Sequence, residues 1–203
     1  MNPARKLLPV ADHLTTARVV IRAYRPADAE ALYESVAASR EHIARWLPWA
    51  HEHTGADYAR DLIARFQQQW RLGEDYTYGV FARTANDQPV DLPANQSATP
   101  SGALLGGLGL HPRHWDVPSF EMGYWLAAHA EGHGYITEAA SALVAYTLRE
   151  MGALRIEIRC DARNARSAAV AQRLGFAQEA LLHKHRRAAD GSLRDTLIFA
   201  KVV

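Results

Sequence analysis

Gly132 and Gly134 stand one residue apart in the segment "EGHGYITEAA", residues 131–140. Glycine lets the backbone approach an anion closely because it has no Cβ, and the helix expected after the pair leaves its first N–H groups without intrahelical partners. These N–H groups and the helix dipole favour a bound phosphate. The segment therefore predicts either a phosphate site or a helix entry in which the glycines serve backbone geometry alone.

Two nucleotide-binding motifs fit this turn poorly. The dinucleotide fingerprint G-x-G-x-x-G needs a third glycine where the chain has Thr137, and the sequence G-K-[ST] of a P-loop is absent. A second glycine cluster, "LLGGLGLH" at 104–111, lies among apolar residues and is most simply explained by strands that bend or pack closely.

Asn164 and Ser167 form a second polar pair, in the segment "CDARNARSAAVAQRLGF". A side-chain oxygen at a helix N-cap accepts a hydrogen bond from a backbone N–H two or three residues later, and Ser167 could add a further capping group. From the spacing alone, capping is the favoured interpretation of both residues.

Apolar patterns predict the elements that position these residues. Strands are expected at 18–24, 76–83, 103–111, 119–127 and 154–160, and a terminal pair at 176–187 and 193–203 flanks the turn "ADGS". Helices are expected from Pro26 to about Ser39, over 54–73, over 135–151 with Gly152 as the cap, and from Asn164 to Gly175. This mixed order indicates an α+β fold, and the polar segment 84–102 predicts a long mobile loop.

Composition limits the functional classes. The chain has 203 residues, 48% of them hydrophobic, which suits a single domain over 1–203. With 23 basic and 22 acidic residues the net charge is +1, so no strong field favours nucleic acid or a membrane surface as a partner. Cys160 is the only cysteine and the N-terminal segment has too short an apolar run for a signal peptide or membrane span, so we expect a cytoplasmic protein.

Two histidine pairs have spacings that could suit a metal ion. They are His111 with His114, and His129 with His133. No cysteine or carboxylate constellation accompanies them in the sequence, so no metal is expected.

The segment "CDARNARSAAVAQRLGF", with the glycine turn about thirty residues before it, resembles the Gcn5-related N-acetyltransferase (GNAT) superfamily. The pair "EMGYWL" and "EGHGYITEA" is similar to its ribosomal-protein N-terminal acetyltransferase (RimJ/RimL-like) branch. The resemblance runs from "ARVVIRAYRPADAEAL" to "ADGSLRDTLIFA" and includes "RWLPWA". It implies an acyl-CoA N-acyltransferase fold, with a mixed, mostly antiparallel splayed sheet flanked by helices and a core over about 15–203.

The resemblance also implies a binding mode for acetyl-CoA as co-substrate. Pantetheine would lie along the strand at 119–127, and the turn amides would take the pyrophosphate. The implied contacts are Tyr124, Trp125, Leu126, Gly132, His133, Gly134, Tyr135, Ile136, Thr137 and Asn164.

Glu131 departs from the family motif, which has Arg or Gln at this position. Two alternatives are open: the carboxylate turns away toward a cation such as Arg173 or Arg166, or coenzyme A binds more weakly.

Amide formation from a thioester needs a neutral amine, support for a tetrahedral oxyanion and a proton for the leaving thiolate. The resemblance puts the hydroxyl of Ser167 near the thioester sulfur and the amide of Asn164 on the pantetheine or acyl end. Strand alternation points Glu121 to the same face as Gly123 and Trp125, where it would be either a base acting through water or a solvated carboxylate.

Trp46 and Trp49 would either line the acceptor pocket or pack a helix end. The expected reaction is direct transfer of acetyl from acetyl-CoA to a primary amine in a ternary complex, foremost to a protein N-terminal α-amine. Alternatives are a small amine, such as a polyamine, an aminoglycoside or an amino-acid-like toxin, and a non-catalytic acyl-CoA-binding module. The sequence leaves the oligomeric state open, a homodimer included.

Overall fold

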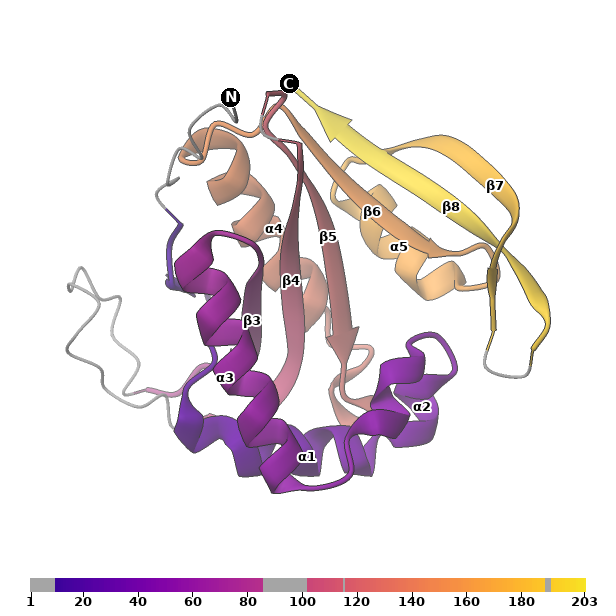
Figure 1. Cartoon of the computed structure of the whole chain (residues 1–203). Helices are drawn as coiled ribbons and strands as arrows, with labels where there is room; N and C mark the ends of the chain where they lie inside the picture. Colours follow the sequence, from indigo (N-terminus) through magenta and orange to yellow (C-terminus); the bar gives the residue numbers. More distant parts are fainter. Residues whose placement is uncertain (1–9, 86–101, 115, 189–190) are drawn as a thin grey trace.

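The computed structural model describes residues 10–85, 102–114, 116–188 and 191–203, which form one mixed sheet with helices on both faces (Figure 1). The eight strands are β1 (His13–Thr15), β2 (Val19–Ala23), β3 (Tyr76–Ala82), β4 (Leu104–His114), β5 (Ser119–Leu126), β6 (Arg155–Asp161), β7 (Ala177–Arg187) and β8 (Leu193–Val202), in the order β1-β2-β3-β4-β5-β6-β8-β7. The helices are α1 (Ala29–Ala38), α2 (Arg40–Ala44), α3 (Ala56–Leu72), α4 (Tyr135–Arg149) and α5 (Ala165–Arg173), with short 3-10 turns η1 (Pro26–Asp28), η2 (Pro48–Glu52) and η3 (Ala128–Ala130).

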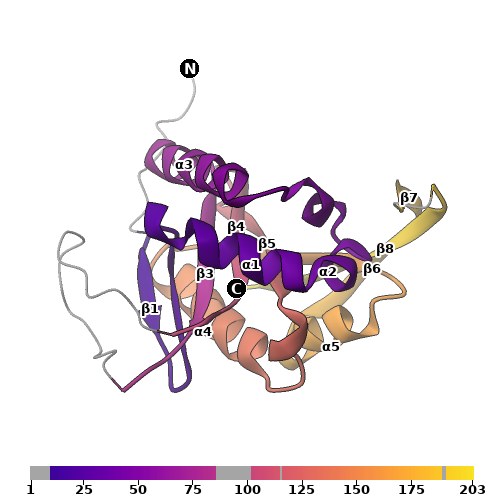
Figure 2. The same cartoon turned by 90° about the horizontal axis from the view of Figure 1, so that it is seen from below.

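Strand alternation sends neighbouring residues into two separate apolar cores. On β2, Ile21 packs into a core with α4, whereas Val20 packs into a core with α1 and α3. Leu143 of α4 packs in the same core as Ile21, and Ile63 of α3 packs in the same core as Val20. Figure 2 shows α1 and α3 on one side of the sheet and α4 on the other.

The sheet divides between β5 and β6. β5 pairs with β4 over its whole length, from Ser119 to Leu126. In the described part of the chain, β5 pairs with β6 in parallel only from Ser119 to Glu121, opposite Arg155 to Glu157. The two strands therefore separate beyond Glu121, as Figure 1 shows, and leave a gap in the middle of the sheet.

The α+β class and the splayed mixed sheet expected from the sequence are confirmed. α4 ends at Arg149, two residues earlier than expected, and β4 continues to His114. The sequence patterns missed β1 and α2, because elements of three and five residues are too short to show a period. Residues 86–101 of the expected long loop lie outside the described residues.

No helix within the described ranges is long and apolar enough to cross a membrane.

A buried ion pair fixes the entry from β2 into α1. Arg22 is 2% exposed, and its two terminal nitrogens contact the carboxylate oxygens of Asp28 at 2.7 and 2.8 Å. The guanidinium also lies 3.9 Å from the ring centroid of Phe81, and the backbone N–H of Arg25 donates to Asp28 at 2.7 Å. Removal of the carboxylate would leave a buried positive charge without its partner.

Asp28→Ala should therefore lower the free energy of unfolding by about 3–5 kcal/mol, measured by chemical denaturation. The matched control is Asp57→Ala, which removes an exposed carboxylate that contacts Arg60 on α3 and should leave the midpoint almost unchanged. Equal losses in both variants would contradict the importance of the buried pair.

Candidate active site

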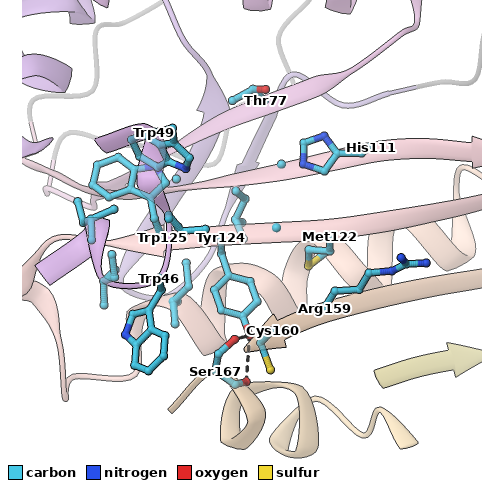
Figure 3. A pocket seen from close by; sticks show the side chains of 18 of the residues that line it. Trp46, Trp49, Thr77, His111, Met122, Tyr124, Trp125, Arg159, Cys160 and Ser167 are labelled. Carbon is cyan, nitrogen blue, oxygen red and sulfur yellow. Dashed lines mark hydrogen bonds between the residues drawn. The ribbon is translucent and has the colours of Figure 1, made fainter. Parts of the chain in front are cut away.

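A cleft of about 690 Å³ lies where β5 and β6 separate. Strands β4, β5 and β6 and helix α5 line one side, and α1, α2, η2 and α3 line the other. Tyr124 and Trp125 point to opposite faces of β5, and both line the cleft (Figure 3). The cleft therefore passes through the sheet and connects its two faces.

A hydroxyl cluster occupies the α5 side of this cleft. The hydroxyl oxygens of Tyr124 and Ser167 are 2.9 Å apart, and Tyr124 also donates to the backbone oxygen of Ser167 at 3.1 Å (Figure 3). Burial raises the pKa of Tyr124, while its hydrogen bond with Ser167 acts in the opposite direction. Tyr124 is therefore neutral at physiological pH and keeps a proton that it can donate.

Asn164 caps α5, as the spacing predicted. Its side-chain oxygen accepts from the backbone N–H of Ser167 at 3.1 Å. This bond uses the backbone of Ser167 and leaves the Ser167 hydroxyl for Tyr124 and the cleft. The helix cap therefore does not occupy the Ser167 hydroxyl, which stays available for a role in the cleft.

Cys160, at the end of β6, lies beside the same hydroxyl cluster. Burial raises the pKa of its thiol, and a hydrogen bond with Ser167 lowers it in part. The thiol is therefore held in its protonated form, which is a poor nucleophile.

The turn before α4 has the conformation that the glycine pair predicted. Gly132 and Gly134 have φ angles of 78° and 79°, which residues with a Cβ rarely adopt. No side chain of the described residues caps α4, so the N–H groups of its first turn remain available to an anion. The side chain of Arg18 stabilises the turn by donating to the backbone oxygen of His133 at 2.8 Å.

Glu138, in the first turn of α4, holds Arg18 in place. Its carboxylate accepts from the Arg18 side chain at 2.7 Å and from the Thr16 hydroxyl at 2.6 Å. Burial raises the pKa of Glu138, but the hydrogen bonds from Thr16 and Arg18 outweigh this effect and hold the pKa below its ordinary value. The carboxylate therefore stays ionised at neutral pH and stabilises the turn.

Glu131 turns toward Arg166, which is the first of the two alternatives left open by the sequence. One carboxylate oxygen contacts Arg166 on α5, and the other lies 2.9 Å from the Nε2 atom of His42 on α2. This pairing offsets the negative charge next to the turn.

Glu121 lines the cleft but is held between two guanidinium groups. Its Oε2 atom contacts Arg113, and the Nε atom of Arg159 lies 3.3 Å from the same oxygen. This arrangement favours an organising role for Glu121 over that of a free base.

Trp49 packs edge-on against Trp125 at a centroid distance of 6.0 Å and lies 5.3 Å from the ring of His53. Trp46 also lines the cleft, and its backbone oxygen accepts from Arg194 of β8 at 3.3 Å. The two tryptophans thus belong to the wall opposite β5.

The cleft therefore brings many of the sequence-predicted residues together. Its lining includes Trp46, Trp49, Glu121, Tyr124, Trp125, Leu126, Ile136, Asn164 and Ser167. Five others are not part of this lining: Gly132, His133 and Gly134 in the turn before α4, and Tyr135 and Thr137 in the first turn of α4. The sequence patterns do not indicate the bond between Tyr124 and Ser167 or the contact of His111 with Asp75. The one available signal is strand alternation, which places Tyr124 and Trp125 on opposite faces of β5.

The described residues contain no group of three or more histidine, cysteine or acidic side chains placed to hold a metal ion.

The splayed sheet, the glycine turn and the cleft define an acyl-CoA N-acyltransferase fold. The acetyltransferase (GNAT) domain family model matches residues 18–177, and the chain belongs to this family. It is an acetyl-CoA-dependent N-acetyltransferase. The chain is 31% identical over 161 residues to a putative ribosomal N-acetyltransferase, YdaF, from Bacillus subtilis (strain 168), with 79% of each protein covered.

Two solved structures illustrate the similarity of fold. RimL, a ribosomal-protein alpha-N-acetyltransferase in complex with coenzyme A, has a TM-score of 0.80 and 19% identity, with 94% of this chain and 97% of that chain covered. The microcin self-immunity acetyltransferase MccE, in complex with acetyl-CoA and AMP, has a TM-score of 0.78 and 19% identity, with 93% and 94% covered.

Ser167→Ala should lower kcat by about 100-fold while acetyl-CoA binding changes little, because the variant loses the hydroxyl expected to donate a proton and keeps the backbone N–H that Asn164 caps. Steady-state kinetics and calorimetric titration measure the two effects. Ser141→Ala, an exposed site on α4, is the matched control. Unchanged turnover in Ser167→Ala, with chemistry shown to be rate-limiting, would leave this residue without a catalytic role.

Proposed function

We propose that this protein transfers the acetyl group of acetyl-CoA to the N-terminal α-amine of a protein. The observation that carries the proposal is the cleft through the sheet, which joins the hydroxyl cluster on the α5 side to the tryptophan-lined side under α1 and α3. A thioester on one side and an amine on the other could meet there without a covalent enzyme intermediate. This geometry suits direct attack in a ternary complex.

Acetyl-CoA would supply an activated acyl group as a thioester. The N–H groups of residues 132–137 would bind its pyrophosphate, and the separated edge of β5 would take the pantetheine amides. Asn164 uses its oxygen in the cap and has its NH₂ group to donate to pantetheine or the acyl end. Tyr124 and Ser167 would deliver the proton that the departing thiolate needs.

The α-amine is the preferred acceptor for two reasons. Its pKa is about 7.7–8.0, against about 10.4 for lysine, so a larger fraction is neutral near physiological pH and a weak base suffices. The cleft, with a volume of about 690 Å³, would also admit the end of a chain. The relative from Bacillus subtilis, described as a putative ribosomal N-acetyltransferase, supports a ribosomal protein as the acceptor.

A small polar amine is a second candidate acceptor. The hydroxyl of Tyr24 and the Nδ1 atom of His53 line the cleft, are buried, and have no hydrogen-bond partner among the described residues. Burial, and then the nearby charge of Arg40, lower the pKa of His53, so its imidazole is neutral. Two buried polar atoms without partners would be satisfied by the polar groups of a compact ligand.

Acetyl-CoA should raise the melting temperature of the protein, because a ligand that binds only the folded state stabilises it. NAD and ATP should produce no shift, since the turn lacks both of their binding motifs. Thermal denaturation with each ligand at equal concentration measures the difference. A shift with NAD alone would contradict the proposed binding mode.

The acceptor is tested by mass spectrometry of peptides and small amines incubated with acetyl-CoA. We expect acetylation of a free peptide N-terminus and little acetylation of a matched peptide with a blocked N-terminus and an internal lysine. Efficient acetylation of a small amine, with every free peptide N-terminus unmodified, would favour the second candidate instead.

A further inference from the structure

One polar pair in the cleft is not used by the chemistry proposed above. The Nδ1 atom of His111, on β4, lies 2.8 Å from the Oδ1 atom of Asp75, in the connection between α3 and β3. Both residues line the cleft, and their side chains are 37% and 24% exposed. The pair is thus accessible from the side where the acceptor would enter.

The contact with Asp75 determines which nitrogen of His111 carries the proton. An ionised carboxylate only accepts hydrogen bonds, so Nδ1 is the donor. In the neutral imidazole, Nε2 is then left with a lone pair. His111 therefore has the tautomer that a general base requires.

The Nε2 atom of His111 lies over two glycines of β4 and β5, where a side chain would come close to it. A Cβ added to Gly109 would lie 2.5 Å from Nε2, and one added to Gly123 would lie 3.4 Å from it. The imidazole thus extends over backbone that carries no side chains. His111 pairs with Glu121 across β4 and β5, so it shares the face of Glu121 rather than that of Tyr124 (Figure 3).

Arginines hold the neighbouring carboxylate, which distinguishes the two possible bases. Glu121 contacts both Arg113 and Arg159, whereas the Nε2 atom of His111 faces the two glycines. Among the residues of α3 that line the cleft, Arg65 is the charged one. Among these groups the imidazole is the one that presents an unshared nitrogen lone pair to the cleft as a proton acceptor.

We propose that His111 is the general base that deprotonates the acceptor amine and that Asp75 is its positioning residue. The proposal rests on the proposed acetyl transfer. Nε2 takes a proton from the ammonium group, the amine nitrogen then forms the C–N bond, and the C–S bond breaks. The departing sulfur receives a proton from the hydroxyl cluster of Tyr124 and Ser167. The nitrogen then loses its second proton, and this proton replaces the one that the hydroxyl cluster gave up. The imidazolium of His111 returns its proton to solvent.

The test is the pH dependence of acetyl transfer to a peptide α-amine by His111→Asn. We expect kcat/KM to fall by about 10-fold near about pH 7 and the loss to disappear by about pH 9, because an amine with a pKa of about 7.7–8.0 is only about one-tenth neutral at the lower pH and almost fully neutral at the higher pH. His114→Asn, at the exposed end of the same strand, is the matched control and should retain wild-type rates.

Asp75→Asn should reduce kcat near neutral pH with little change in KM, since an amide no longer fixes the Nδ1 proton. The melting-temperature shift with acetyl-CoA should persist in all three variants, which separates chemistry from folding. A loss of equal size at both pH values in His111→Asn, or no loss, would overturn the role of His111 while acetyl transfer by the wild type stands. Absence of transfer by the wild type to any amine would overturn the proposed function itself.

Discussion

The end of the pairing between β5 and β6 at Glu121 and Glu157 is the constraint on which the site depends. Beyond this point β6 continues with β8 and β5 continues with β4, so the two halves of the sheet separate. Arg159 joins the halves at the point of divergence, because it contacts Glu157 on its own strand at 2.8 Å and Glu121 on β5 at 3.3 Å. The backbone edge exposed in the gap needs hydrogen-bond partners, and a ligand with amide groups can provide them.

The divergence also places two helix N-termini at the cleft. α4 begins at Tyr135 with open N–H groups, and α5 begins after Asn164 with its cap satisfied from within. The first helix start is therefore free for an anion, whereas the second supplies the rigid support for Ser167. Glu131 links the two regions through Arg166, so a residue that departs from the family motif contributes to the architecture of the site.

Local signals account for the part of the site that the sequence predicted. The glycine turn, the cap at Asn164 and most helix and strand positions depend on residues close together in the chain. The contacts of Tyr124 with Ser167 and of His111 with Asp75 depend on tertiary register, which no short pattern carries. For the same reason, the sequence marks His111 only as half of a possible metal-ligand pair with His114, and it carries no signal for the arginines that hold Glu121.

The most direct test of the account is a crystal structure of the protein with a bisubstrate analogue, in which coenzyme A is joined through an acetyl linker to the N-terminus of a peptide. We expect the pyrophosphate on the N–H groups of residues 132–137, pantetheine in the gap beside β5, and the sulfur next to the hydroxyl of Ser167. The peptide should leave the cleft on the side of His111 and the tryptophans. Pantetheine bound outside the gap between β5 and β6, or a peptide that leaves on the α4 face, would contradict it.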